Sequence, residues 1–158
     1  MHDVLRIGGV TLAALLGAAG ALTSVLLASG PGAPVNELVI LLVVVAYALV
    51  AVLVSLVRPG QPMGRLLLAG SCAWGVGEGL FALAVRATEQ GHRPLAGWLS
   101  VFGDLRGLGW LVLVLGVPLV FPDGRTPWGG RRPVVLAGAA IAVFLTGSIL
   151  APRRWTTG

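Results

Sequence analysis

The hydrophobic positions of this chain fall into long runs that short polar connections separate. The runs lie at about residues 7–28, 38–57, 66–85, 98–121 and 134–150. Each is close to the roughly 20 apolar residues that an α-helix needs to cross a bilayer. An isolated strand cannot satisfy its backbone in lipid, so even the β-branched run at 38–57 predicts a helix. The pattern therefore predicts an all-α, polytopic membrane bundle of about five transmembrane helices, in a single domain over residues 1–158.

The first run has an alternative interpretation as a secretory signal. The apolar core of a signal spans about 7–15 residues and leads to a small-residue cleavage site. Here the run from Ile7 to Ala28 is longer than such a core, and Pro31 and Pro34 follow it. We therefore predict a membrane helix at this end of the chain.

The predicted connections between the runs are rich in proline, glycine and polar residues. They lie at residues 30–37, 58–62, 86–94 and 121–133, and the last is the longest and most basic. Such residues break helices and favour turns. Pro118, near the end of the fourth run, predicts a kink or an approaching helix terminus.

Composition agrees with a membrane protein. The chain is 56% hydrophobic and only 11% charged, whereas soluble domains carry about 25% charged residues. Its positive charge comes from arginines alone, scattered between the hydrophobic runs, which argues against a nucleic-acid partner. Cys72 is the only cysteine and His2 and His92 lie far apart, so we expect no intramolecular disulfide, no metal site and no cofactor.

The arginines predict the orientation of the bundle. Alternate segments place Arg6, Arg58, Arg65, Arg125, Arg131 and Arg132 on one side, and Arg86, Arg93, Arg153 and Arg154 on the other. The positive-inside rule then favours a cytoplasmic N-terminus, in the plasma membrane of a bacterium. Five crossings would leave the short tail Ala151–Gly158 outside, so we expect a sixth helix to follow in a longer protein.

Three ionisable residues lie within the predicted membrane helices. They are Glu78 in the third helix and Asp104 and Arg106 in the fourth. A charge at the bilayer centre costs about 2.5–3.5 kcal/mol, so such residues usually face the bundle interior and pair. With about 1.5 Å of rise per residue, Glu78 and Arg106 reach a similar depth, which predicts that they pair. A structural contact without a ligand is the preferred interpretation, with sensing or transport as alternatives.

Neighbouring residues support this pairing. Trp74 precedes Glu78 by four residues and Trp110 follows Arg106 by four, so each tryptophan shares a face with its charge. The two tryptophans are also predicted to lie level in an antiparallel helix pair. Asp104 is two positions from Arg106 and is expected to point elsewhere, to the headgroup region or another helix.

Both helices also carry pairs of glycines four residues apart. These are Gly75 with Gly79, and Gly103 with Gly107. Small residues at this spacing let two membrane helices approach closely. We therefore expect these glycines to pack the third helix against the fourth beside the charged pair.

Two connections carry more specific patterns. Arg58-Pro-Gly-Gln-Pro-Met-Gly-Arg-Leu-Leu-Leu leads into the third helix, and Phe121-Pro-Asp-Gly-Arg-Thr-Pro follows the fourth. Together they resemble loops in the N-terminal membrane region of sensor histidine kinases of high-GC bacteria, over roughly residues 35–155. The matching positions are Arg58, Pro59, Pro62 and Gly64 in the first loop, and Phe121, Pro122, Asp123, Gly124 and Arg125 in the second. Met63 and Arg65 depart from that pattern, which has isoleucine and tryptophan there.

The resemblance implies a role in two-component signal transduction. In that family a further crossing leads to a phosphoacceptor helix and an ATP-binding domain, so the full-length parent would be a protein histidine kinase. This chain has no histidine in a polar amphipathic helix and no nucleotide-binding box. It would therefore be the membrane-embedded input region, without a catalytic part, acting on signals within the bilayer. Its expected partners are the lipid bilayer and a second copy of the chain, and its ligand is not indicated.

Two other classes of function stay open. A transporter or a subunit of a transport complex could use Glu78, Asp104 and Arg106 along a polar path, although the sequence shows no inverted repeat. A membrane enzyme would need a cluster of catalytic side chains at a membrane surface, where we see only Asp123 among arginines. Substrate flux into liposomes would distinguish transport from signalling.

Overall fold

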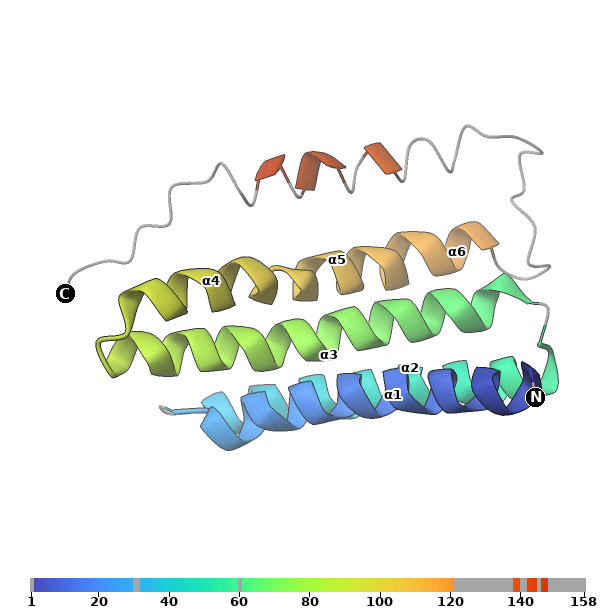
Figure 1. The fold of residues 1–158 in the computed structure, drawn as a ribbon, viewed down its shortest axis with the longest axis horizontal. Coiled ribbons are helices and arrows are strands. Elements are labelled where there is room, and N and C mark those ends of the chain that lie inside the picture. The colour runs from blue at the N-terminus through green and yellow to red at the C-terminus, as the bar shows by residue number, and fades with distance from the viewer. Residues whose placement is uncertain are drawn as a thin grey trace.

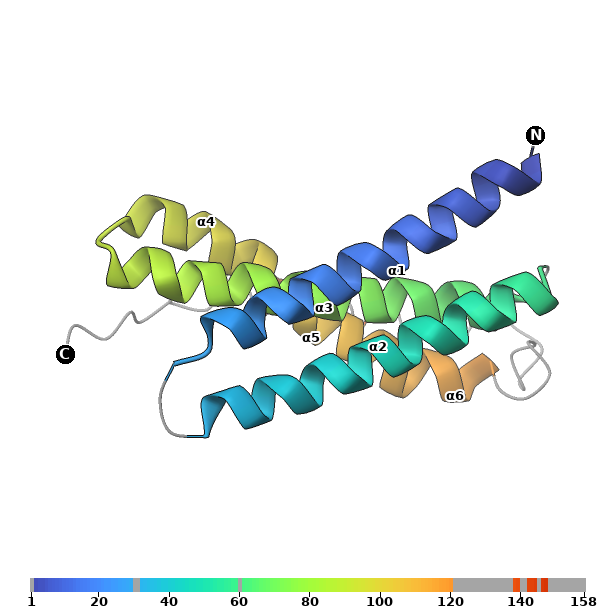
Figure 2. The same ribbon diagram turned by 90° about the horizontal axis from the view of Figure 1, so that it is seen from below.

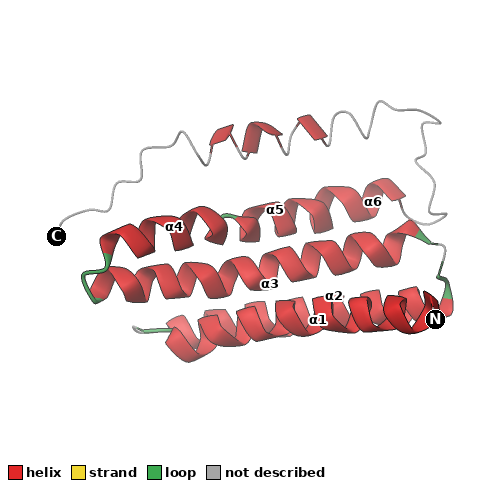
Figure 3. Ribbon diagram, in the orientation of Figure 1, coloured by secondary structure: helices red, strands yellow, loops and turns green. Residues whose placement is uncertain are grey.

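The structure is a computed structural model that describes residues 2–29, 32–59 and 61–120, with the short stretches 138–139, 142–144 and 146–147. The described part of the chain consists of helices joined by short connections and contains no strand (Figure 3). The predicted all-α helical bundle is confirmed.

Three long helices open the bundle. They are α1 (His2–Leu27), α2 (Ala33–Val57) and α3 (Pro62–Glu89), and successive helices run in opposite directions (Figure 1). A fourth span follows in pieces: α4 (Arg93–Gly103), α5 (Leu105–Leu111), the π-helical turn η1 (Val112–Gly116) and α6 (Val117–Val120). We call the end where α1 ends and α4 begins the distal end; it lies on the left in Figure 1.

Four helices are long and apolar enough to span a bilayer. These candidate spans are Arg6–Leu27, Ala33–Val57, Pro62–Glu89 and Arg93–Gly116. Most of the predicted fifth helix, residues 134–150, lies outside the described residues, and the few positions that are described there are helical. The described residues thus form a helical membrane bundle.

The side chains are distributed as a bilayer requires. Large apolar side chains such as Leu26, Leu42 and Leu49 are exposed on α1 and α2. The buried positions are instead dominated by small residues, among them Ala48 and Ala51. Lipid tails are as apolar as leucine, so membrane helices gain little by burying large side chains and associate through small residues that allow close packing.

The central element is α3. It contacts α1 and α2 on one side and α4 and α5 on the other (Figures 1 and 2). Its buried residues include five glycines, Gly64, Gly70, Gly75, Gly77 and Gly79. Because these glycines occur on several faces of the helix, neighbouring backbones can approach α3 from more than one direction.

Each of the four spans begins four or five residues earlier than its hydrophobic run indicated, and α3 also ends later. The predicted turn at 30–37 is wrong in its second half, because α2 already begins at Ala33, and the predicted connection at 86–94 is wrong at both ends, because α3 extends to Glu89 and α4 begins at Arg93. Pro34 and Pro94 lie in first turns of helices, where the missing N–H has no helical partner to lose. The actual turns need residues with positive φ, Gly32 at 79° and Gly91 at 80°.

The predicted fourth helix at 98–121 is also corrected, because it is not continuous. It is interrupted at Asp104, where the N–H of Gly107 donates to the Asp104 carbonyl in a tight turn at 3.0 Å. A π-helical turn follows over Val112–Gly116. Pro118 lies two residues after the end of this turn, and its ring excludes the usual hydrogen bond to the carbonyl four residues earlier. The helix continues past Pro118 to Val120, so the kink or terminus predicted from Pro118 stays a prediction.

Candidate functional site

Glu78 of α3 and Arg106 of α5 form an ion pair inside the bundle. Arg106 Nη1 lies 3.5 Å from Glu78 Oε2, and the side chains are 37% and 9% exposed. The contact predicted from the matched depths of the two residues is confirmed. Its length exceeds the 2.7–2.9 Å of a charge-assisted hydrogen bond, so the attraction is electrostatic without a tight hydrogen bond.

Trp74 holds the other carboxylate oxygen. Its indole Nε1 donates to Glu78 Oε1 at 3.0 Å, one helical turn along α3. This agrees with the prediction that Trp74 shares a face with Glu78. The two oxygens of Glu78 therefore have different partners, one on its own helix and one on α5, and the carboxylate is oriented by Trp74 whether or not Arg106 is close.

Phe81 completes the environment of the arginine. The guanidinium carbon of Arg106 lies 3.7 Å from the centroid of the Phe81 ring, in a cation–π contact. The sequence analysis did not identify Phe81, although its position three residues after Glu78 places it on the same face of α3. We call Trp74, Glu78, Phe81 and Arg106 the clasp.

Close backbone contact brings α5 to the clasp. A Cβ at Gly77 would collide with the backbone nitrogen of Arg106. A Cβ at Gly109 would likewise collide with the backbone nitrogen of Trp74 and with the Gly70 carbonyl oxygen. A Cβ at Gly103 would lie about 3.1 Å from Phe81, which confirms the predicted place of Gly103 between the third and fourth spans. Glycines are therefore needed where α3 meets the fourth span, but only Gly103 among these was predicted.

Gly75 and Gly79 do not face the fourth span, contrary to prediction. A Cβ at Gly75 would meet Gly17 of α1, and a Cβ at Gly79 would meet Gly20 of the same helix. Positions two residues apart on a helix point about 200° apart, so Gly77 and its neighbours Gly75 and Gly79 address different helices. Gly75 and Gly79 therefore pack α3 against α1.

Gly107 and Trp110 also differ from their predicted places. Gly107 lies against the ring of Phe144 rather than against α3. Trp110 is 48% exposed, and the α5 residue that lies against Trp74 is Gly109. Trp110 is thus not a packing residue of the clasp. Asp104 is partly buried at the junction of α4 and α5, where it marks the break in the fourth span.

The first motif loop forms a tight turn between α2 and α3. The backbone N–H of Arg58 donates to the Val54 carbonyl at 2.8 Å, Pro59 follows, and Pro62 begins α3. Gly64 is buried, and a Cβ there would lie 2.6 Å from the Ser55 hydroxyl oxygen. The residues of the first loop pattern are thus explained by their roles in ending α2, beginning α3 and packing the two helices together. The second loop, with Phe121, Pro122, Asp123, Gly124 and Arg125, lies outside the described residues.

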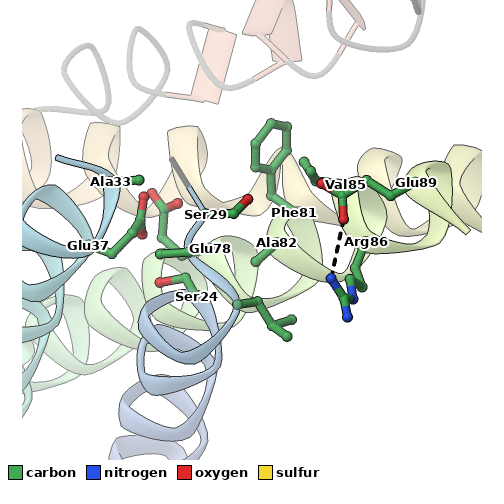
Figure 4. Close-up of a pocket in the computed structure, with 12 residues that line it drawn as sticks. Ser24, Ser29, Ala33, Glu37, Glu78, Phe81, Ala82, Val85, Arg86 and Glu89 are labelled. Carbon is green, nitrogen blue, oxygen red and sulfur yellow. Dashed lines mark hydrogen bonds and ion pairs between the residues drawn. The ribbon is translucent and has the colours of Figure 1, made fainter. Parts of the chain in front are cut away.

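A cavity of about 160 Å³ lies beside the clasp, toward the distal end. It is bounded by the end of α1, the first turns of α2 and the last three turns of α3 (Figure 4). Glu78 and Phe81 form part of its wall, so the clasp and this distal cavity share two side chains. The sequence analysis did not predict the cavity, because the ends of three helices create it.

Glu37 contributes a second carboxylate to the distal cavity. Its Oε2 is fully enclosed and has no hydrogen-bond partner, and its carboxylate points toward that of Glu78 in Figure 4. The sequence analysis assigned Glu37 to a turn and gave it no role. Two features of the sequence could have indicated a role for Glu37. It directly precedes a strongly apolar run, and it lies at the same end of the predicted bundle as Glu78.

The mouth of the distal cavity carries a separate ion pair. Arg86 Nη1 and Glu89 Oε2 lie 3.4 Å apart on α3, and both side chains are largely exposed. Exposed pairs of this kind contribute little to stability. Among the described residues no group of three His, Cys, Asp or Glu side chains could hold a metal ion. The site is therefore a carboxylate-lined cavity beside an intramembrane ion pair.

Comparison of the chain with known protein families, with curated proteins and with solved structures finds no match. The resemblance to sensor histidine kinases therefore depends on the two loop patterns alone, and of these only the first, apart from Gly60, lies within the described residues. Any assignment of function has to be argued from the geometry of the clasp and the distal cavity.

Proposed function

We propose that this chain is the membrane-embedded input region of a two-component signalling system, the role that its loop motifs imply. The observation that carries the proposal is the clasp, which joins the central helix to a short segment bounded by two irregular turns. Arg106 lies in α5, a helix of seven residues between the break at Asp104 and the π-helical turn η1. Irregular turns of this kind are common at functional sites in helices.

The clasp has the properties of an element with two states. An ion pair buried in a bilayer attracts strongly, but this one is 3.5 Å long and its arginine is 37% exposed. Opening it therefore costs less than the roughly 3–5 kcal/mol that loss of a fully buried partner costs. A ligand that prefers one state shifts the equilibrium by its differential affinity, and a free energy of this size is within reach of ligand binding.

The proposed orientation connects this movement to the cytoplasm. We place the N-terminus and both motif loops on the cytoplasmic side of a bacterial plasma membrane, as the arginine distribution favours. The distal cavity then opens toward the outside. A shift of α5 relative to α3 would move η1 and α6, which lead toward the second motif loop and any helix that follows it.

The test uses cells of the organism that encodes the chain. We would replace the gene by variants carrying Arg106→Gln or Glu78→Gln and measure the phosphorylated fraction of each response regulator. At least one regulator is expected to change by roughly five-fold or more, as for typical coupling between two sites. Arg86→Gln is the matched control, because Arg86 is exposed and lies outside the clasp.

Unchanged phosphorylation of the response regulators would contradict a signalling role. If gene deletion and both clasp variants leave every response regulator as phosphorylated as in wild-type cells, the input role is wrong. A loss of the protein from the membrane has to be excluded first by quantifying it in the membrane fraction.

Transport of a small cation is the second candidate, and the enclosed, unpartnered Oε2 of Glu37 in the wall of the distal cavity favours it. Purified protein in liposomes would be tested for uptake of radiolabelled methylammonium. Signalling predicts no uptake above that of empty liposomes. Uptake that disappears with Glu78→Gln would replace the signalling proposal by transport.

A further inference from the structure

The distal cavity and the clasp share two side chains. Glu78 and Phe81 line the cavity, and the same two residues contact Arg106. A ligand bound against this part of the wall therefore touches the groups that hold α5 against α3. If the chain is an input region as proposed, the chemistry of this cavity defines the stimulus that it receives.

The charges around the cavity do not cancel. Arg106 compensates Glu78, and Arg86 and Glu89 compensate each other at the mouth. Glu37 Oε2 is enclosed and has no partner. Enclosing an oxygen of a carboxylate without a hydrogen-bond donor or a counter-charge is unfavourable, so the site is complementary to a positive charge beside Glu37 Oε2.

The size of the cavity limits what can supply that charge. Its volume of about 160 Å³ is close to that of an engineered cavity of about 150 Å³ that binds benzene, a molecule of six heavy atoms. The described residues offer no set of three metal ligands here. A small organic cation fits the volume, and its apolar part can contact Ala82 and Val85 on the same wall.

The acceptors favour a cation with N–H groups. A primary ammonium ion has three donors, and the cavity presents the free Glu37 oxygen together with the Glu78 carboxylate. Ser24 adds a hydroxyl whose proton is already donated to the Ala21 carbonyl at 2.8 Å, which leaves its oxygen able to accept. We propose that the distal cavity binds a small primary ammonium ion between Glu37 and Glu78, in competition with Arg106 for the Glu78 carboxylate.

The competition follows from the distances. The Arg106 contact with Glu78 Oε2 is 3.5 Å long, whereas an ammonium ion in the cavity can approach to the 2.7–2.9 Å of a charge-assisted hydrogen bond. Trp74 continues to hold Oε1 and keeps the carboxylate in place. Binding thus weakens the attraction of α5 to α3, and by reciprocity an open clasp binds the ion more tightly.

The experiment is a titration of the purified full chain in lipid nanodiscs with methylammonium chloride at constant ionic strength. Tryptophan fluorescence is the readout, because the Trp74 indole is hydrogen-bonded to Glu78. We expect a saturable change for methylammonium that sodium does not produce and that Trp74→Phe removes. Tetramethylammonium, which has no N–H donor, is expected to bind at least ten-fold more weakly, about 1.4 kcal/mol.

Two variants locate the site. Glu37→Gln is expected to weaken methylammonium binding at least ten-fold, because a charge-assisted hydrogen bond is lost. This variant should fold, since Glu37 Oε2 has no partner to lose. Glu89→Gln is the matched control: its carboxylate is 49% exposed and already paired with Arg86, so solvent screening should keep its effect below about two-fold.

Several results would overturn this inference. They are the absence of saturable binding, equal affinity in wild type and Glu37→Gln, and a fluorescence change that follows pH alone, which would make the carboxylates a proton site. None of them touches the signalling proposal, which the clasp variants test through the response regulators. Conversely, methylammonium binding in a protein whose variants leave every regulator unchanged would keep the site and reject signalling.

Discussion

Gly77 of α3 lies directly against the backbone nitrogen of Arg106 in α5, so that a single added methyl group would separate the two helices. This contact places the guanidinium of Arg106 between the Glu78 carboxylate and the Phe81 ring. The ion pair therefore depends on a glycine on the neighbouring helix as well as on its own two charges. A substitution at Gly77 can therefore disturb the ion pair while every polar group of the clasp stays intact.

Replacing Gly77 by alanine should open the clasp. The new Cβ would collide with backbone rather than with a flexible side chain, and overpacking of this kind costs about 1–3 kcal/mol. Gly97→Ala is the matched control, because nothing lies within 4 Å of a Cβ there, and alanine should stabilise that helix by up to about 1 kcal/mol. Unfolding midpoints in detergent should thus shift in opposite directions. Equal shifts would show that the close approach at Gly77 is unimportant.

Replacing Trp74 by phenylalanine should weaken the clasp without changing its charges. The substitution removes the hydrogen bond from Nε1 to Glu78 Oε1, and side-chain hydrogen bonds between groups in membrane helices contribute about 0.6–1.7 kcal/mol. Trp98→Phe is the control, since Trp98 is 69% exposed. Its effect should stay within about 0.5 kcal/mol. A smaller loss at Trp74 than at Trp98, measured by reversible unfolding in mixed micelles, contradicts the assignment of Trp74 to the clasp.

Replacing Glu37 by glutamine should stabilise the empty protein. The carboxylate oxygen Oε2 is enclosed without a partner, and an unsatisfied buried group costs about 1–3 kcal/mol, more when it is charged. Neutralising it is expected to raise the free energy of unfolding by roughly 1 kcal/mol. The measurement is chemical unfolding without any amine in the buffer, beside Glu89→Gln as control. A destabilised Glu37→Gln variant would mean that Glu37 has a stabilising partner.

The depth of residues in the bilayer could be predicted from the sequence, whereas helix rotation could not. The pairing of Glu78 with Arg106 needed only the rise per residue and the up-and-down order of the helices. The partner of Gly75 depended on which face of α3 meets which neighbour. That rotation is fixed by α1, α2, α4 and α5 packing on α3 together, and no local pattern contains this information.

The helix ends show a second limit. Proline can end a helix or occupy its first turn, and the sequence analysis treated residues 30–37 and 86–94 as breaks. In the structure Pro34 and Pro94 lie in first turns. The same error concealed Glu37, which was assigned to a turn but extends from α2 into the distal cavity. A cavity formed by three helix ends depends on the bounds of all three helices, so small errors in the predicted bounds are enough to miss the cavity.

The central claim is that Glu78 and Arg106 attract each other across the interface of α3 and α5. A double-mutant cycle of Glu78→Gln, Arg106→Gln and the double variant, measured by reversible unfolding in lipid-detergent micelles, tests it most directly. The account predicts a favourable coupling energy of at least about 0.5 kcal/mol, as for residues in direct contact. Strictly additive effects of the two substitutions would contradict it.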